Sequence, residues 1–163
     1  MRKVQTREEK RASLIEWEAK YGHDRKGSSM QHLLDLDDEF PSVEMFGPQC
    51  ISAQVGPGWS GLLREALVVL ASLGGKLGQV KQKFGGLRIY WDPPEALRQQ
   101  YLEWCVAGSI GSSPYDLSAE YQLVRSTVDR ASELSLSTCE HCSAPIDPPR
   151  LMSYQTLCDG CAK

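Results

Sequence analysis

Four cysteines near the end of the chain carry the clearest chemistry in the sequence. They form two C-x-x-C pairs, Cys139/Cys142 and Cys158/Cys161, with fifteen residues between the pairs. Each pair turns tightly and directs two sulfurs towards one point, and this spacing is typical of four thiolates around one zinc ion. Four sulfurs fill a tetrahedral site and leave no position for water or substrate. The sequence therefore predicts one structural zinc, bound by Cys139, Cys142, Cys158 and Cys161.

Two disulfides, or a redox-active pair, are the alternative interpretation of these cysteines. The chain starts with Met1-Arg2-Lys3 and continues into a charged segment, so we expect no signal peptide and a cytoplasmic location. Thiols stay reduced in that compartment, which favours metal binding. His141 lies within the first pair and could replace a sulfur. Since four cysteines already complete the site, we expect His141 at the surface.

Composition limits the possible partners. The 163 residues suit one ordinary domain with a small appendage. No apolar run approaches the length of a transmembrane helix, so we expect no membrane contact. The net charge of −3 excludes a global positive field, and nucleic-acid binding would need a local basic patch.

One segment offers such a patch. Two alternating runs joined by Gly85-Gly86 predict a β-hairpin over residues 79–91 with a primed turn. Its core face would come from Val80, Phe84, Leu87, Ile89 and Trp91. Its candidate binding residues are the cations Lys76, Lys81, Lys83 and Arg88. Three interpretations stay open: a solvated edge that resists pairing, a contact with a protein or acidic ligand, and a single-strand nucleic-acid contact.

Helices are predicted on both sides of this hairpin. A capping box at Thr6 and Glu9 begins a helix over residues 6–21, with an apolar stripe at Leu14, Trp17 and Tyr21. Residues 59–73 form the most apolar helix, which predicts burial. Two more are expected: one capped by Asp92, with the apolar face Leu97, Tyr101, Trp104 and Cys105, and a long helix over residues 115–136 with Leu117 on its buried side.

These elements predict an α+β fold: helices packed on a small antiparallel hairpin or sheet, followed by a zinc ribbon-like module. Three parts are expected, namely an N-terminal helix and irregular loop region (1–55), an α+β core (56–137) and the zinc-binding module (138–163). The acidic segment 33–40 lacks the order of a calcium loop and predicts a solvated face with apolar anchors. Cys50 and Cys105 lack a C-x-x-C partner and are expected to be small buried residues.

A resemblance covers residues 56–161. The hairpin Val80-Lys81-Gln82-Lys83-Phe84-Gly85-Gly86-Leu87-Arg88-Ile89-Tyr90, the helix start Gly58-Trp59 and the two cysteine pairs resemble small proteins of phages and bacterial genomes that join a VKxKFGGLRxY hairpin to a zinc knuckle pair. The resemblance implies a phage or prophage setting and no particular chemistry. Similar chains usually have glycine after the second cysteine, where this chain has Ser143. That position often takes a left-handed conformation, which costs a residue with a side chain about 1 kcal/mol.

Together these features predict a non-enzymatic, zinc-stabilised binding protein. The expected partner is a macromolecule, first of all a protein; if the chain is encoded by a phage, the partner would be a host enzyme or a defence component in the host cytoplasm. The alternative is a nucleic-acid-binding accessory protein that uses the basic hairpin and the zinc module. An enzyme is not expected, because the metal site is closed and the sequence contains no phosphate-binding loop and no catalytic triad or metalloprotease motif.

Overall fold

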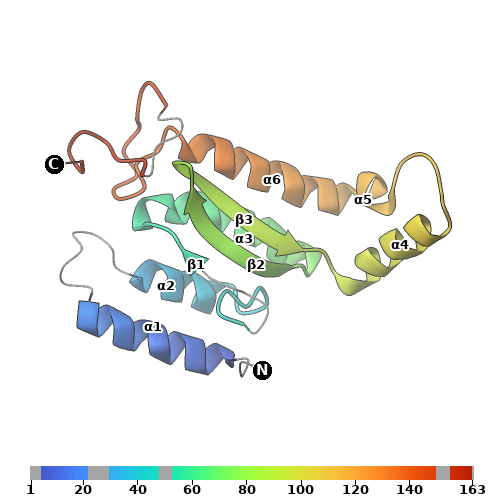
Figure 1. Cartoon of the computed structure of the whole chain (residues 1–163), viewed down its shortest axis with the longest axis horizontal. Helices are drawn as coiled ribbons and strands as arrows, with labels where there is room; N and C mark the ends of the chain where they lie inside the picture. Colours follow the sequence, from blue (N-terminus) through green and yellow to red (C-terminus); the bar gives the residue numbers. More distant parts are fainter. Residues whose placement is uncertain (1–4, 22–29, 48–52, 150–154, 163) are drawn as a thin grey trace.

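The structure is a computed structural model and describes residues 5–21, 30–47, 53–149 and 155–162, without the side chains of Trp17 and Tyr21. The predictions for Trp17, Tyr21 and Cys50 therefore lie outside the described part. The fold is α+β, as predicted, and ends in a cysteine cluster (Figure 1). Its sheet has the order β1 (Ala53–Gln54), β2 (Lys76–Lys83) and β3 (Gly86–Asp92). β1 runs parallel to β2, and β2 pairs antiparallel with β3.

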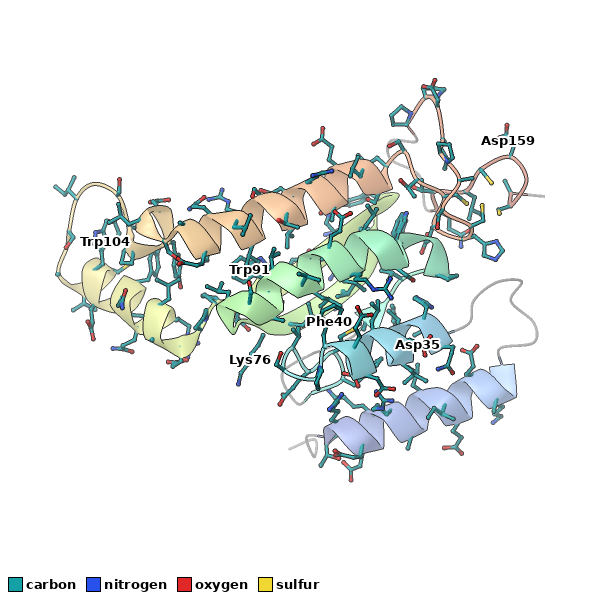
Figure 2. All side chains as sticks on the ribbon, turned by 180° about the vertical axis from the view of Figure 1, so that it is seen from behind. Asp35, Phe40, Lys76, Trp91, Trp104 and Asp159 are labelled. Atoms are coloured by element: carbon teal, nitrogen blue, oxygen red, sulfur yellow. The ribbon has the colours of Figure 1, made fainter. Side chains whose placement is uncertain are left out.

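Two helices bury one face of this sheet. α3 (Ser60–Leu73) follows a short 3₁₀ turn at Pro57–Trp59 and ends at Gly74 in the left-handed conformation. α6 (Ala119–Ser135) packs against α3 and along β3. α3 lies across the sheet in Figure 2, whereas the strands lie in front of it in Figure 1. The core between these layers contains, among others, Trp59, Leu63, Leu67, Leu77, Val80, Leu87 and Val124.

Two N-terminal helices extend the same core. α1 (Arg7–Tyr21) begins at the predicted capping box, in which Thr6 and Glu9 each receive a backbone hydrogen bond from the other residue. α2 (Gln31–Glu39) buries Leu33, Leu34 and Leu36 in the core shared with α3. The division at residue 55 stays a prediction, although the apolar core includes side chains from both sides of it.

The acidic segment corrects one expectation. Asp37 is fully buried rather than solvated, and it accepts hydrogen bonds from Arg7 (3.0 Å from Nε) and from Arg11. Arg7 also donates to the Asp37 carbonyl at 3.0 Å. A buried carboxylate needs such partners, because an unpaired charge in the interior is costly. The positive charges that pair with Asp37 thus come from α1 of the same chain.

The hairpin turn lies one residue earlier than predicted. Lys83 pairs with Gly86, so the two turn residues are Phe84 and Gly85, with φ of 55° and 77°. Positive φ at both positions is the signature of a type I′ turn, and the prediction of a primed turn is therefore correct. Gly86, in contrast, is a strand residue of β3. Phe84 leaves the predicted core face and is 60% exposed at the tip of the hairpin.

Phe84→Asn is expected to stabilise the protein by about 1 kcal/mol. A left-handed backbone costs a residue such as phenylalanine about 1–2 kcal/mol, whereas Asn-Gly is the preferred type I′ pair. Phe84→Ala is the matched control, because it removes the same ring and keeps the strained backbone of a residue with a Cβ. Thermal unfolding should give a higher melting temperature for the asparagine variant only. Equal melting temperatures for both variants would show that the turn is not strained.

A helical arm projects from the end of the sheet that lies away from the C-terminus (Figure 1). α4 (Glu95–Val106) starts three residues after the predicted cap Asp92, which belongs to β3, and none of its residues is buried. Cys105, predicted to be buried, is therefore exposed. The helix predicted over residues 115–136 is split at Ser118, whose extended backbone and side chain cap α6. The first piece, α5 (Pro114–Leu117), leaves Leu117 74% exposed instead of buried.

Stacked aromatic rings, and not a buried core, attach this arm to the rest of the fold. Tyr115 stacks between Tyr101 of α4 and Tyr121 of α6, at centroid distances of 4.3 and 4.5 Å. Tyr121 in turn contacts Trp91 of β3 at 4.9 Å. Of the predicted apolar face of α4, Tyr101 thus packs on Tyr115 of α5 instead of on the core. None of the helices within the described residues has the length and apolar character needed to cross a membrane.

Candidate metal centre and open sheet face

The four cysteines predicted from the sequence come together in space. Their sulfurs all lie within 4.8 Å of one another, and those of Cys142 and Cys158 are 3.6 Å apart. Figure 2 shows sulfur atoms gathered close to the labelled Asp159. Tetrahedral binding at a metal–sulfur distance near 2.3 Å places sulfurs about 3.8 Å apart. The donor set and its spacing therefore fit one metal ion. His141, half-buried, is not part of this cluster.

Local hydrogen bonds shape both cysteine pairs in the same way. The Ser143 N–H donates to the Cys139 carbonyl at 3.0 Å, and the Cys161 and Ala162 N–H groups donate to the Cys158 carbonyl, each at 3.0 Å. Each pair is thus a tight turn that holds its two sulfurs on one side. Within the described residues the surrounding segment is made of turns and a single β-bridge, between Thr138 and Pro145.

Ser143 takes the left-handed conformation expected after the second cysteine, with a φ of 62°. The hydroxyl of Ser143 donates a hydrogen bond of 2.9 Å to the Gly58 carbonyl. Glycine at this position would avoid the backbone cost but could not make this bond. A hydrogen bond contributes about 1 kcal/mol, which is close to the left-handed penalty. Serine instead of glycine at position 143 therefore changes the folding stability little.

The thiols respond strongly to their surroundings. Burial disfavours the thiolate of Cys139, but backbone hydrogen bonds from Cys158, Cys142 and His141 outweigh it and lower the pKa to about 6. Contacts with Cys142 and Cys158 raise the pKa of Cys161 to about 12. Without a metal the surroundings therefore favour the thiolate of Cys139 and disfavour that of Cys161, and like charges at this distance repel one another. A bound cation would reverse that opposition, because metal binding releases the thiol protons.

The segment Gly56-Pro57-Gly58-Trp59 joins the cysteine cluster to the core. The buried Trp59 indole donates to the Thr138 carbonyl at 2.8 Å, and the Gly58 N–H donates to the Glu140 carbonyl at 2.7 Å. A Cβ on Gly58 would lie 2.1 Å from the Cys139 carbonyl oxygen. Only glycine allows the two backbones to approach this closely. The start of α3 is thus fitted directly onto the first cysteine pair.

Glu140 adds a side-chain contact to the same joint. The Gly56 N–H donates to the Glu140 carboxylate at 3.2 Å. Burial raises the pKa of Glu140, and the hydrogen bond from Gly56 partly opposes that rise. The first cysteine pair and the residues on either side of it are therefore attached to the start of α3 by three side-chain hydrogen bonds, from or to Glu140, Ser143 and Trp59, and by the main-chain bond from Gly58.

Thr156 connects the second cysteine pair to the hairpin. Its side chain is fully buried and donates a hydrogen bond to the Gly85 carbonyl in the turn. Its own carbonyl accepts from the Glu140 N–H at 2.7 Å. Nearby, the Leu87 N–H of β3 donates to the Ser135 hydroxyl of α6 at 2.8 Å. The cysteine cluster, the hairpin turn and α6 therefore support one another.

The second candidate site is the sheet face turned away from α3. Cross-strand pairing puts Gln79 opposite Tyr90, and Lys81 opposite Arg88, on that face, and Lys83 follows next to the turn. We call these five residues, with Phe84, the open sheet face; no helix of the described residues lies in front of it in Figure 1. Lys81 and Lys83 lie over the rings of Tyr90 and Phe84, at 5.0 and 5.1 Å.

The open sheet face carries three cations. Within the described residues, Lys81, Lys83 and Arg88 form no ion pair with a carboxylate. Like charges on directly opposed strand residues, such as Lys81 and Arg88, destabilise a sheet. The arrangement therefore favours a ligand that brings negative charge.

Lys76 corrects the predicted cluster. It stands at the far end of β2, opposite Asp92, and Figure 2 shows it at the end of the sheet remote from the C-terminal segment. Lys83 lies seven positions after Lys76 along β2, which corresponds to about 23 Å. The structure therefore groups Lys81, Lys83 and Arg88, and leaves Lys76 outside.

Sequence reasoning missed the two residues that link the sites to the core. Thr156 carried no motif, and its role depends on a contact with Gly85, far away in the sequence. Gly58 was noted only as the start of a helix, although two glycines around a proline before a buried tryptophan can indicate a close backbone approach.

Comparisons with protein-family models, curated proteins and solved structures found no match to this chain.

Proposed function

We propose that this chain is a non-enzymatic, zinc-stabilised binding protein, and that its open sheet face binds an anionic macromolecule. The cysteine cluster supports zinc, since four thiolates in a closed set are a typical structural zinc site. Such a site leaves no open position for catalysis. The single observation that carries the binding proposal is a group of three cations that have no carboxylate partner among the described residues and lie on a sheet face with no described helix in front of it.

Zinc and binding are connected through Thr156. The ion would hold the second cysteine pair close to the first, and the hydrogen bond from Thr156 to Gly85 would then fix the hairpin tip. Lys83 and Phe84 lie at this tip. The metal would therefore act on binding by holding the face in shape. The positive charge of the ion would be neutralised by the four thiolates and would not attract the ligand itself.

Reversal of two charges tests the face. Lys81→Glu with Lys83→Glu should remove retention on heparin-agarose, a sulfated polymer, or bring elution to markedly lower salt. The expected cause is loss of the counterion release that accompanies each anion contact. Arg125→Glu with Arg130→Glu is the matched control, because both arginines are exposed on α6 and the change in net charge is the same. If both double variants elute alike, the open sheet face is not the binding site.

A protein partner, the first expectation from the sequence, is the second candidate. Its support is the α4–α5 arm, where the apolar side chains of Leu102, Val106, Ile110 and Leu117 are exposed. Exposed apolar patches mark protein contacts in many proteins. A pull-down with and without nuclease separates a direct protein partner from one bridged by nucleic acid. The phage setting and the cytoplasmic location are parts of this proposal.

A further inference from the structure

We infer that the ligand of the open sheet face is single-stranded nucleic acid, read by stacking on Tyr90 and Phe84. This inference rests on the proposed function and names the ligand class of the same site. Tyr90 is 45% exposed and Phe84 is 60% exposed, and both are on or beside a face that also carries three cations. Base–aromatic stacking next to a positive groove is how proteins bind single strands with little sequence preference.

Phe84 supplies the strongest indication. An aromatic side chain in solvent adds nothing to the core, and its φ of 55° costs folding free energy. Strained residues that the rest of the structure holds in place are found mainly at functional sites. The buried turn glycine and Thr156 provide that support here. A ring offered to a ligand accounts for both the strain and the exposure.

The spacing between the Tyr90 and Phe84 rings suits an extended single strand of nucleic acid. Tyr90 lies about five residues, or roughly 17 Å, from the turn along β3. Lys81 and Arg88 lie between the two rings, and Lys83 is next to Phe84. A strand along this line would place bases on the rings and phosphates near the cations. A duplex keeps its bases stacked on one another, so the exposed rings favour unpaired bases.

An acidic protein segment is the competing ligand, and the rings distinguish it from nucleic acid. An acidic peptide or heparin needs only the positive charge, whereas single strands also use the aromatic faces. Removing a ring without changing the charge should therefore weaken one kind of binding and spare the other.

Fluorescence anisotropy of the full-length, zinc-loaded protein tests this, with labelled oligonucleotides of roughly 15 nucleotides, single-stranded DNA and RNA and a duplex, in about 100 mM salt. Heparin and a polyglutamate peptide serve as base-free polyanions. We expect salt-sensitive binding of the single strands, and about a tenfold loss of affinity in Tyr90→Ala and in Phe84→Asn. Both variants should keep wild-type affinity for heparin. Since Phe84→Asn is expected to stabilise the fold, its loss of binding could not come from unfolding.

Three other results of this experiment would contradict the inference, the stacking or the proposed function. If heparin or polyglutamate binds and no single strand does, the nucleic-acid inference is wrong and the proposed anionic partner stands. If single strands bind with equal affinity to the wild type and both ring variants, stacking is wrong. If neither oligonucleotides nor polyanions bind, both the inference and the proposed function fail.

Discussion

Cys142→Ser is expected to remove the metal and release the C-terminal segment from the core. Serine is a poor zinc ligand, and metal binding free energy in such a site is also folding free energy. We expect the free energy of unfolding to fall by about 3–5 kcal/mol. Hydrogen exchange should show faster exchange around Thr156 and in the hairpin turn, because the contact between Thr156 and Gly85 depends on the cluster.

Cys105→Ser is the matched control for this variant. Cys105 is exposed on α4 and lies outside the cysteine cluster. The same chemical change there should leave zinc content, stability and exchange unaltered. Wild-type metal content and melting temperature in Cys142→Ser would mean that this cysteine is not a ligand.

Gly58→Ala is expected to cost about 3 kcal/mol or more, although it adds a single methyl group. The added Cβ would lie 2.1 Å from the Cys139 carbonyl oxygen and 2.7 Å from the Ser143 nitrogen. These are backbone atoms of the first cysteine pair and cannot rotate away. Either α3 or the pair must shift, which breaks the 2.7 Å hydrogen bond from Gly58 to Glu140. Overpacking alone typically costs 1–3 kcal/mol.

Gly61→Ala gives the comparison, because it makes the same change three residues later. Apart from its chain neighbours and the backbone of its own helix, nothing lies within 4 Å of a Cβ at Gly61, which is an exposed residue of α3. Alanine is a better helix former than glycine, so we expect Gly61→Ala to stabilise the protein by up to about 1 kcal/mol. Chemical denaturation would measure the free energy of unfolding of both variants, and competition with a chelator would measure their zinc affinity. Similar stability and zinc affinity in the two would contradict the close packing of α3 on the cysteine pair.

The local features of the fold could be predicted because they depend on neighbours in the sequence. The capping box at Thr6, the glycine that ends α3 and the two C-x-x-C turns each follow from a few adjacent residues. The hairpin was also predictable, except that the turn is Phe84-Gly85. Gly-Gly suggested the usual turn residues, but a phenylalanine with positive φ is rare and no local rule predicts it.

The errors share a different cause, which is tertiary context. Asp37 is buried because two arginines of α1 reach it, and neither lies nearby in the sequence. The apolar face of α4 predicted burial, but the helix lies beyond the sheet and packs on Tyr115 instead. Lys76 was grouped with the other cations by sequence proximity, whereas strand length separates them. The sequence pattern of a helix or strand predicts which of its faces is apolar. What covers that face depends on how the elements are arranged in space.

Zinc K-edge X-ray absorption on the full-length protein, purified under reducing conditions without added metal, tests the central claim most directly. We expect one zinc per chain with four sulfur neighbours at about 2.3 Å, supplied by Cys139, Cys142, Cys158 and Cys161. Protein that contains no zinc, or a zinc shell in which nitrogen or oxygen replaces a sulfur, would contradict it.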